Sequence, residues 1–147
     1  MKFSSRVEFY FQRMARRVKV AKKKGLFRVA GKIRTATKRS MRLKPGASKP
    51  GAPPHAHQSS SSGLRAIEFN VDYSGEKALI GPVKFPRSNY FDAPATFIQE
   101  FGGTFRTQKS VAHFPKRSFM EYTLKRLVAK GEIDKDFNVG MARVIGF

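Results

Sequence analysis

A proline- and glycine-rich segment in the middle of the chain divides it into two parts of different composition. Residues 45–63 hold four prolines and three glycines, end in a run of serines, and show no hydrophobic periodicity. Such a composition predicts a loop. Loops longer than about 12–15 residues are uncommon inside compact domains and tend to be functional or disordered. The segment is therefore either a docking loop or a disordered tether between two structured parts.

Positive charge is concentrated before this loop. The formal net charge is +20, and residues 1–46 carry 16 Lys and Arg side chains against a single acid, Glu8. The remaining residues carry 14 basic and 9 acidic side chains. Such asymmetry indicates a polyanionic partner, either nucleic acid or an acidic protein surface. The alternative is a helix face whose charges are only solvated.

The basic part reads as a helix over residues 1–44. Val7, Phe11, Met14, Val18 and Ala21 recur at spacings of three and four, which predicts an apolar helical stripe. The sequence SRVE at residues 5–8 matches a capping box, although the alternation in VEFYF also allows a strand there. A second stripe follows Gly25, so the helix is either one long element or is kinked at that glycine. The Pro-Gly pair at 45–46 is expected to stop it.

The part after the loop reads as a small body of sheet and helix over residues 64–130. Apolar and polar residues alternate from Leu64 to Tyr73, and the turn sequence SGE precedes ALI, which predicts a β-hairpin. ATFIQEF predicts a short helix ended by Gly102 and Gly103, and residues 104–113 predict two short strands. The capping-box sequence SFME at 118–121 predicts a further helix that ends at Gly131. The tail, residues 131–147, is either a final strand or an arm docked on a neighbour.

We therefore predict one α+β domain over residues 1–147, a small antiparallel sheet packed against a long N-terminal basic helix and a shorter C-terminal helix. The chain has no cysteine, which excludes disulfides and thiolate chemistry. No apolar run approaches the roughly 18 residues of a membrane span, and no secretory h-region stands at the N-terminus. We expect no membrane partner.

Enzyme signatures are absent from the sequence. There is no phosphate-binding P-loop, no dinucleotide glycine fingerprint and no nucleophile elbow. The ten acids are scattered, so no general acid–base pair is proposed. His55 and His57 lie in the loop without cysteine or carboxylate neighbours, and His113 stands alone, so they predict exposed or structural histidines. We expect no catalytic residues, no metal and no cofactor.

Nucleic-acid binding is the clearest alternative to an assembly role. A basic helix can neutralise phosphates and gives binding that weakens steeply with salt. The sequence carries no recognised nucleic-acid motif, so such contact is expected to be non-specific and to the backbone. The candidate contacts with DNA or an acidic partner are Arg16, Arg17, Lys22, Lys23, Lys24, Arg34, Lys38, Arg39 and Arg42.

Several short motifs occur in a definite order over residues 26–130. They are KPG at 49–51, PPH at 53–55, GLR at 63–65, IGP at 80–82, EFGG at 100–103 and RSFM at 117–120. In this order the chain resembles the small tail-completion and head–tail joining proteins of tailed bacteriophages and prophages. Ser118 departs from the family pattern, where proline is commoner, but its capping ability preserves the helix start.

The resemblance implies a structural virion protein with no reaction to perform. Such proteins form six- or twelve-fold rings at the neck or tail top, where they contact portal, adaptor or stopper proteins and the tail tube. The chain would be made in the bacterial cytoplasm and reside in the virion, with loose contact to phage DNA. The loop would reach an adjacent subunit through Lys49, Pro50, Gly51, Pro53, Pro54 and His55. Gly102, Gly103 and Ser118 would have structural roles as turn and helix cap.

Overall fold

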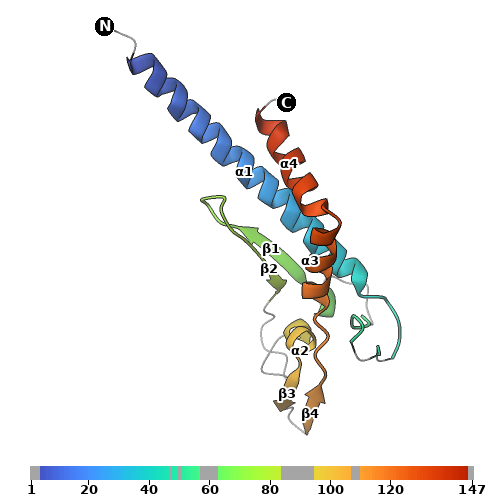
Figure 1. Ribbon diagram of the computed structural model, residues 1–147. Helices are drawn as coiled ribbons and strands as arrows, with labels where there is room; N and C mark the ends of the chain where they lie inside the picture. Colours follow the sequence, from blue (N-terminus) through green and yellow to red (C-terminus); the bar gives the residue numbers. More distant parts are fainter. Residues whose placement is uncertain are drawn as a thin grey trace.

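The computed structural model describes residues 4–46, 48–49, 51–56, 63–83, 95–106 and 110–145. Figure 1 shows a long N-terminal helix against which a hairpin and a C-terminal helix pack, with a second small ribbon at the opposite end of the molecule. The elements in chain order are α1 (Ser4–Ser40), the 3₁₀ turn η1 (Gly63–Arg65), β1 (Ile67–Val71), β2 (Ala78–Pro82), α2 (Ala95–Phe101), β3 (Gly103–Arg106), β4 (Val111–Phe114), α3 (Phe119–Ala129) and α4 (Glu132–Ile145).

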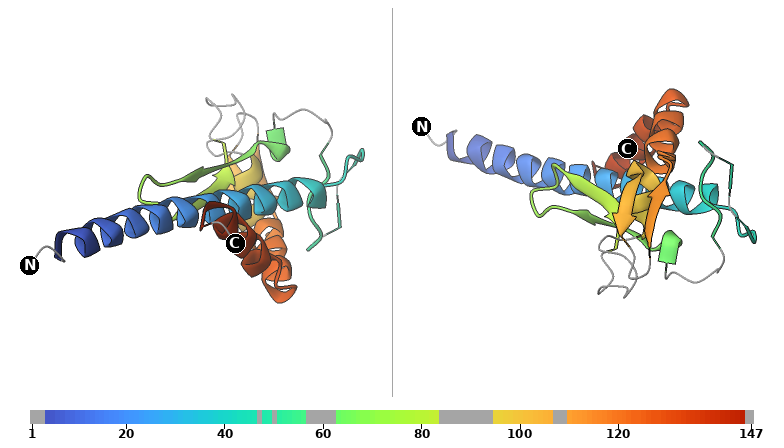
Figure 2. Two further views of the ribbon diagram at one scale, coloured as in Figure 1. Left: turned by 90° about the horizontal axis from the view of Figure 1, so that it is seen from above. Right: turned by 90° about the horizontal axis from the view of Figure 1, so that it is seen from below.

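The long basic helix predicted from the sequence is confirmed as one continuous element. α1 has 37 residues and is therefore about 55 Å long. It is helical from Ser4, so the alternative of a strand at its start was wrong. It ends at Ser40, before the Pro-Gly pair. From residue 10 onwards, its apolar stripe becomes buried at Ala21, because the first half extends beyond the rest of the molecule (Figure 2).

The predicted hairpin is also confirmed. β1 and β2 pair antiparallel with Phe69 opposite Ile80. Gly75 in the connecting turn has φ 73° and approaches α1 closely, because a Cβ there would lie 2.9 Å from the Cβ of Lys23. The alternation seen in the sequence matches burial, since Ile67 and Val71 are buried while Glu68 and Asn70 are exposed. The hairpin lies along α1.

The two strands predicted over residues 104–113 form a separate ribbon. β3 and β4 pair antiparallel, from Gly103 opposite Phe114 to Arg106 opposite Val111. The prediction of α2, α3 and an α+β fold is confirmed. The sheet is nevertheless split into two two-stranded ribbons where we expected one small sheet.

The tail forms a helix, so the expectation of a final strand was wrong. α4 packs on α1 of the same chain, and the two helices run antiparallel, since Lys32 meets Glu132 while Arg28 meets Asp136. Ile133 and Phe137 pack against the α1 cluster of Val29 and Ile33 at helical spacing. That spacing, together with two acids in the first turn, was the sequence signal for a helix.

Among the described residues, two small buried clusters form the core and share Ile80 at their margins. The first joins α1 to α3 through Val29, Ile33 and Leu127. The second joins the end of α1 to β1 and α3 and is made of Met41, Ile67 and Phe119, all at most 2% exposed. The packed half of α1 (residues 21–40) thus organises the body, while its free half (residues 4–20) lies outside it.

Candidate assembly and polyanion-binding surfaces

The free half of α1 combines exposed aromatic and cationic side chains. Tyr10 and Phe11 are 64% and 67% exposed. Arg16 and Arg17 are exposed on the same segment. Between residues 10 and 24 the sequence has seven Lys and Arg side chains and no acid. This stretch therefore presents a positive surface interrupted by an unpartnered apolar stripe.

Three of the predicted contact residues lie where the free half meets the body. Lys22 and Lys24 are exposed, whereas Lys23 is half-buried. The Lys23 ammonium lies 5.2 Å from the centre of the Tyr73 ring at the hairpin turn. A cation over an aromatic face is attracted by the ring quadrupole. Lys23 thus has an intramolecular role, while its two neighbours remain open to a partner.

Two other predicted contact residues are engaged within the chain. Arg34 donates from Nε to the carbonyl of Ile67 at 2.8 Å and pairs through Nη2 with Glu68 at 2.7 Å. Lys38 Nζ lies 3.6 Å from the same carboxylate. The hydrogen bond from Arg34 holds the pKa of Glu68 below its ordinary value. These cations fasten α1 to β1, so they are less available to an external anion.

An ion-pair ladder between α1 and α4 was not foreseen from the sequence. Asp136 is paired with Arg28 at 2.9 Å and with Lys32 at 2.7 Å, and Lys32 also reaches Glu132 at 2.7 Å. Hydrogen bonding to Lys32, and then to Arg28, lowers the pKa of Asp136. The Asp136 hydrogen bond is also the main cause of the raised pKa of Lys32. The partners are 100 residues or more apart in the sequence, a separation that local patterns do not reveal.

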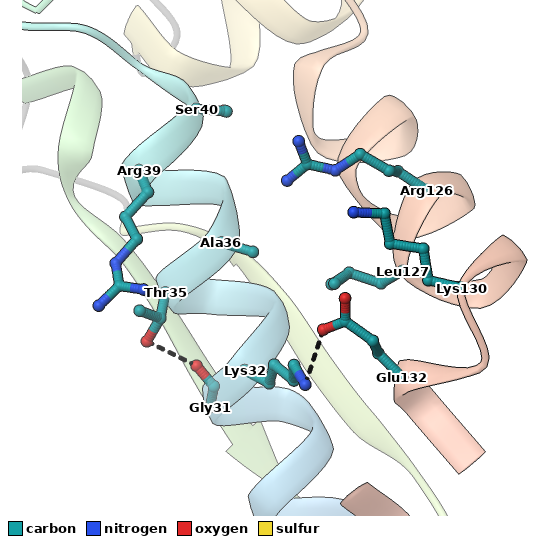
Figure 3. A pocket seen from close by; sticks show the side chains of 10 residues that line it. All are labelled: Gly31, Lys32, Thr35, Ala36, Arg39, Ser40, Arg126, Leu127, Lys130 and Glu132. Carbon is teal, nitrogen blue, oxygen red and sulfur yellow. Dashed lines mark hydrogen bonds and ion pairs between the residues drawn. The ribbon is translucent and has the colours of Figure 1, made fainter. Parts of the chain in front are cut away.

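A cleft between α1 and α3 has four cations and one acid among its ten lining residues (Figure 3). Its volume is about 560 Å³. Arg126 of α3 and Lys130, the residue after α3, extend towards α1, and Glu132 is already bonded to Lys32. A second cavity of about 680 Å³ adjoins it and shares Arg39, Ser40 and Arg126 in its lining. Arg39 and Arg42, both predicted contact residues, are exposed and line this second cavity.

The described part of the predicted docking loop folds back on its own chain. Ala56 bonds with the main chain of Arg42 and Lys44, and Pro54 is buried. The Arg117 guanidinium donates to the Ser48 hydroxyl and to the carbonyls of Ser48, Lys49 and Ala52. For the described residues of the loop, this anchoring contradicts the alternative of a disordered tether.

The individual loop residues differ in their surroundings. Lys49 and Gly51 are exposed, and Pro53 and His55 are half-buried at the second cavity. The His55 ring nitrogen Nδ1 lies 3.3 Å from the Gly46 carbonyl oxygen. Pro50 and His57 lie outside the described residues. The contact of this loop with a neighbouring subunit stays a prediction.

Ser118 does not cap α3 in the way that the sequence predicted. Its backbone is left-handed, with φ 43°, and its hydroxyl makes no capping hydrogen bond. The Glu100 carboxylate of α2 instead accepts from the N–H groups of Met120 at 2.9 Å and Glu121 at 3.1 Å. A buried carboxylate at a helix N-terminus satisfies free donors and interacts favourably with the helix dipole. The side chain that caps α3 is therefore that of Glu100, about twenty residues earlier in the sequence.

Two glycines make the turn from α2 into β3. Gly102 has φ 67° and its N–H donates to the Ile98 carbonyl at 2.9 Å, which closes the last turn of α2. A Cβ on Gly102 would lie 2.6 Å from the backbone nitrogen of Lys116. Gly103 follows with φ 126° and begins β3. This turn brings Glu100 towards the start of α3.

Within the described ranges, no three His, Cys, Asp or Glu side chains come together as a metal-ligand set. His113 lies on β4 with its Nδ1 3.2 Å from the Thr104 hydroxyl. Of the helices in the described part of the chain, none is both long and apolar enough to span a bilayer. The chain matches no protein-family model, no curated protein and no solved structure.

Proposed function

We propose that the chain is a structural subunit of a tailed-phage particle that assembles into a ring at the neck or tail top, where it joins head to tail or completes the tail. The proposal combines the family resemblance of the sequence motifs with the surface that the fold leaves exposed. On this view the protein acts by docking to copies of itself and to adjoining virion proteins.

The observation that carries the proposal is the size of the exposed surface. The chain exposes 11008 Å². A compact monomer of 16.6 kDa is expected to expose roughly 7600 Å². A long helix that extends beyond a small body contributes to this excess (Figure 1). Subunits of obligate assemblies cover such surface with their neighbours.

The chemistry of the exposed surface also supports docking. Tyr73 and Leu79 on the first ribbon are 90% and 78% exposed, in addition to Tyr10 and Phe11 on the free half of α1. Exposed apolar side chains mark protein interaction sites where they gather in a large patch rimmed by polar residues. In a closed ring, one such surface meets a different surface of the next subunit. The excess of cations on the free half favours an acidic neighbour.

Sizing of the purified protein tests the proposal. We expect light scattering to show ring-sized species, or a monomer that assembles when partner virion proteins are added. Tyr10→Ser with Phe11→Ser should abolish assembly without changing the far-ultraviolet circular dichroism. Val128→Ser on α3, where the side chain is 57% exposed, is the matched control and should assemble.

Electron microscopy of particles that lack the protein gives the second readout. Tailless full heads or detached tails are expected, because the joint would be incomplete. Normal infectious particles without the protein would contradict the proposal, and so would a wild-type chain that stays monomeric and never enters particles.

Non-specific binding to DNA or RNA is the second candidate function. The exposed Arg16, Arg17, Lys22 and Lys24 on α1 favour it. It predicts binding to duplex DNA of any sequence that weakens steeply as the salt concentration rises. A charge-reversed Arg16→Glu, Arg17→Glu variant should then lose most of its affinity for duplex DNA.

A further inference from the structure

The two adjoining cavities form one groove that runs between the end of α1, α3 and the anchored loop. They adjoin, since Arg39, Ser40 and Arg126 line both of them, and we treat them as one groove. Their volumes, about 560 and 680 Å³, exceed the space needed for a single inorganic anion. The groove is suited to an extended ligand. In the close-up of Figure 3 its α3 wall directs Arg126 towards α1.

The loop side of the groove is strongly cationic. The second cavity is lined by Arg39, Arg42, Lys44, Lys49 and Arg126, and none of its described lining residues is acidic. Like charges gathered in one hollow repel one another, and this repulsion opposes the folded state. A polyanion relieves it. Arginine binds phosphate with two parallel N–H donors, which favours a phosphate-bearing ligand.

An exposed aromatic ring stands in the same wall. Tyr122 lines the second cavity and is 60% exposed. It precedes Arg126 by four residues on α3, so the two side chains lie on one face of the helix. An aromatic ring beside a cationic track is the combination that binds unpaired bases together with their phosphates. Bases inside a duplex are stacked on one another and do not offer a face to such a ring.

We propose that this groove binds a short stretch of single-stranded nucleic acid, with phosphates on Arg39, Arg42 and Arg126 and one base stacked on Tyr122. The inference rests on the groove alone and does not depend on ring assembly. It differs from the second candidate function in its ligand, a single strand, and in its place, which is away from the free half of α1.

Fluorescence anisotropy with a short labelled oligothymidylate tests the proposal on the full chain. We expect Arg39→Glu with Arg126→Glu to weaken binding by more than about 10-fold. The slope of log affinity against log salt concentration should also become shallower by about 1.4, since each phosphate contact on a single strand contributes about 0.7 to that slope. Lys135→Glu with Arg143→Glu changes the net charge equally at exposed sites on α4. This control should lose less than about 3-fold. Equal losses in the two variants, or no loss in either, would overturn the assignment.

Further variants and competing ligands separate the possible ligands of the groove. Tyr122→Ala should weaken oligothymidylate binding about 5- to 10-fold and leave binding of an equally long duplex unchanged. A duplex whose binding is weakened by Arg39→Glu with Arg126→Glu as much as that of the single strand would overturn the proposal, as would poly-L-glutamate that displaces the oligonucleotide at equal charge. Arg16→Glu with Arg17→Glu should bind the oligonucleotide nearly normally, and a loss equal to that of the groove variant would instead favour the second candidate function.

A folding control keeps the test interpretable. Arg39 and Arg126 are both exposed, so their replacement removes no buried contact. The milder Arg39→Gln, Arg126→Gln variant should show an intermediate loss of affinity. Unchanged affinity in this variant, with native circular dichroism, would count against the groove as the binding site.

Discussion

Gly25 of α1 and Gly140 of α4 meet where the two helices cross, and a Cβ on Gly140 would lie 2.7 Å from the Cα of Gly25. The backbones are therefore in direct contact at this point. The same Cβ on Gly140 would also lie 3.0 Å from the Gly25 nitrogen and 3.1 Å from the Lys24 carbonyl oxygen. Main-chain atoms cannot rotate away as a side chain can.

We expect Gly140→Ala to destabilise the fold by about 1–3 kcal/mol, because the added methyl group pushes α4 away from α1. Chemical denaturation measures this loss. Gly31→Ala is the matched control on α1, since its Cβ would meet only the Phe69 ring at 3.9 Å. It should stabilise the protein by up to about 1 kcal/mol through helix propensity. A Gly140→Ala variant as stable as wild type would show that the crossing is looser than described.

The cap of α3 gives a second prediction. Glu100→Ala should lower the unfolding free energy by about 1–2 kcal/mol, because two backbone N–H groups lose a buried carboxylate acceptor. Ser118→Gly should cause no loss, since glycine adopts the left-handed backbone of that position more readily than serine. Urea denaturation of both variants measures the difference. A larger loss in Ser118→Gly than in Glu100→Ala would restore the serine as the cap.

The α1–α4 ion pairs predict how stability depends on pH. Asp136 has its pKa lowered below 3.8, so its contribution is fully present above that value and is lost as the pH falls through the folded pKa. Lys32 has its pKa raised above 10.5, so its contribution is present below that value and is lost as the pH rises through the folded pKa.

Asp136→Asn should therefore cost about 1 kcal/mol at neutral pH and flatten the loss of stability below about pH 4. Denaturation curves at a series of pH values measure both effects. Glu121→Gln breaks an exposed pair with Lys125 and serves as the control, with a smaller change expected. If the unfolding free energy of Asp136→Asn falls with decreasing pH as steeply as that of wild type, the role of the ion pairs is contradicted.

Arg117 should control the order of the loop. Arg117→Ala removes the donors to three loop carbonyls. The rate of hydrogen exchange at the Ala52 amide is therefore expected to rise by about 10-fold or more. A rise of about 10-fold corresponds to a loss of about 1.4 kcal/mol in the free energy of local opening. Nuclear magnetic resonance measures this rate. Exchange at Leu127, whose side chain is buried in the core, should remain slow. Unchanged exchange at Ala52 would mean that other contacts hold the loop.

Elements with strong local signals were predicted correctly. The helical stripe of α1, the alternation of β1 and the glycines after α2 each reflect a period or a turn within a few residues. α4 was missed even though Ile133 and Phe137 are spaced as on a helix, because the short tail with Gly140 was interpreted as a strand or an arm. That glycine is required by the crossing with Gly25, which only the tertiary structure reveals.

The candidate site was less predictable, because its residues are distant in the sequence. Arg39 and Arg42 could be identified from charge alone. Tyr122, Arg126 and Lys49 come together only after α3 and the loop fold against α1. Conversely, Arg34 and Lys38 carried the same charge signal, yet Glu68 on β1 engages both. Sequence charge therefore does not distinguish a binding cation from one that fastens two elements.

Because α1 is one continuous helix, a change of its tilt at the crossing of Gly25 and Gly140 moves its whole N-terminal half. The first turn of the helix lies about 30 Å from Gly25 along the axis. A tilt of about 10° at the crossing would then carry that turn through roughly 5 Å, close to one full helical pitch. The close fit of two glycines in the body thus sets the position of the distant first turn of the helix.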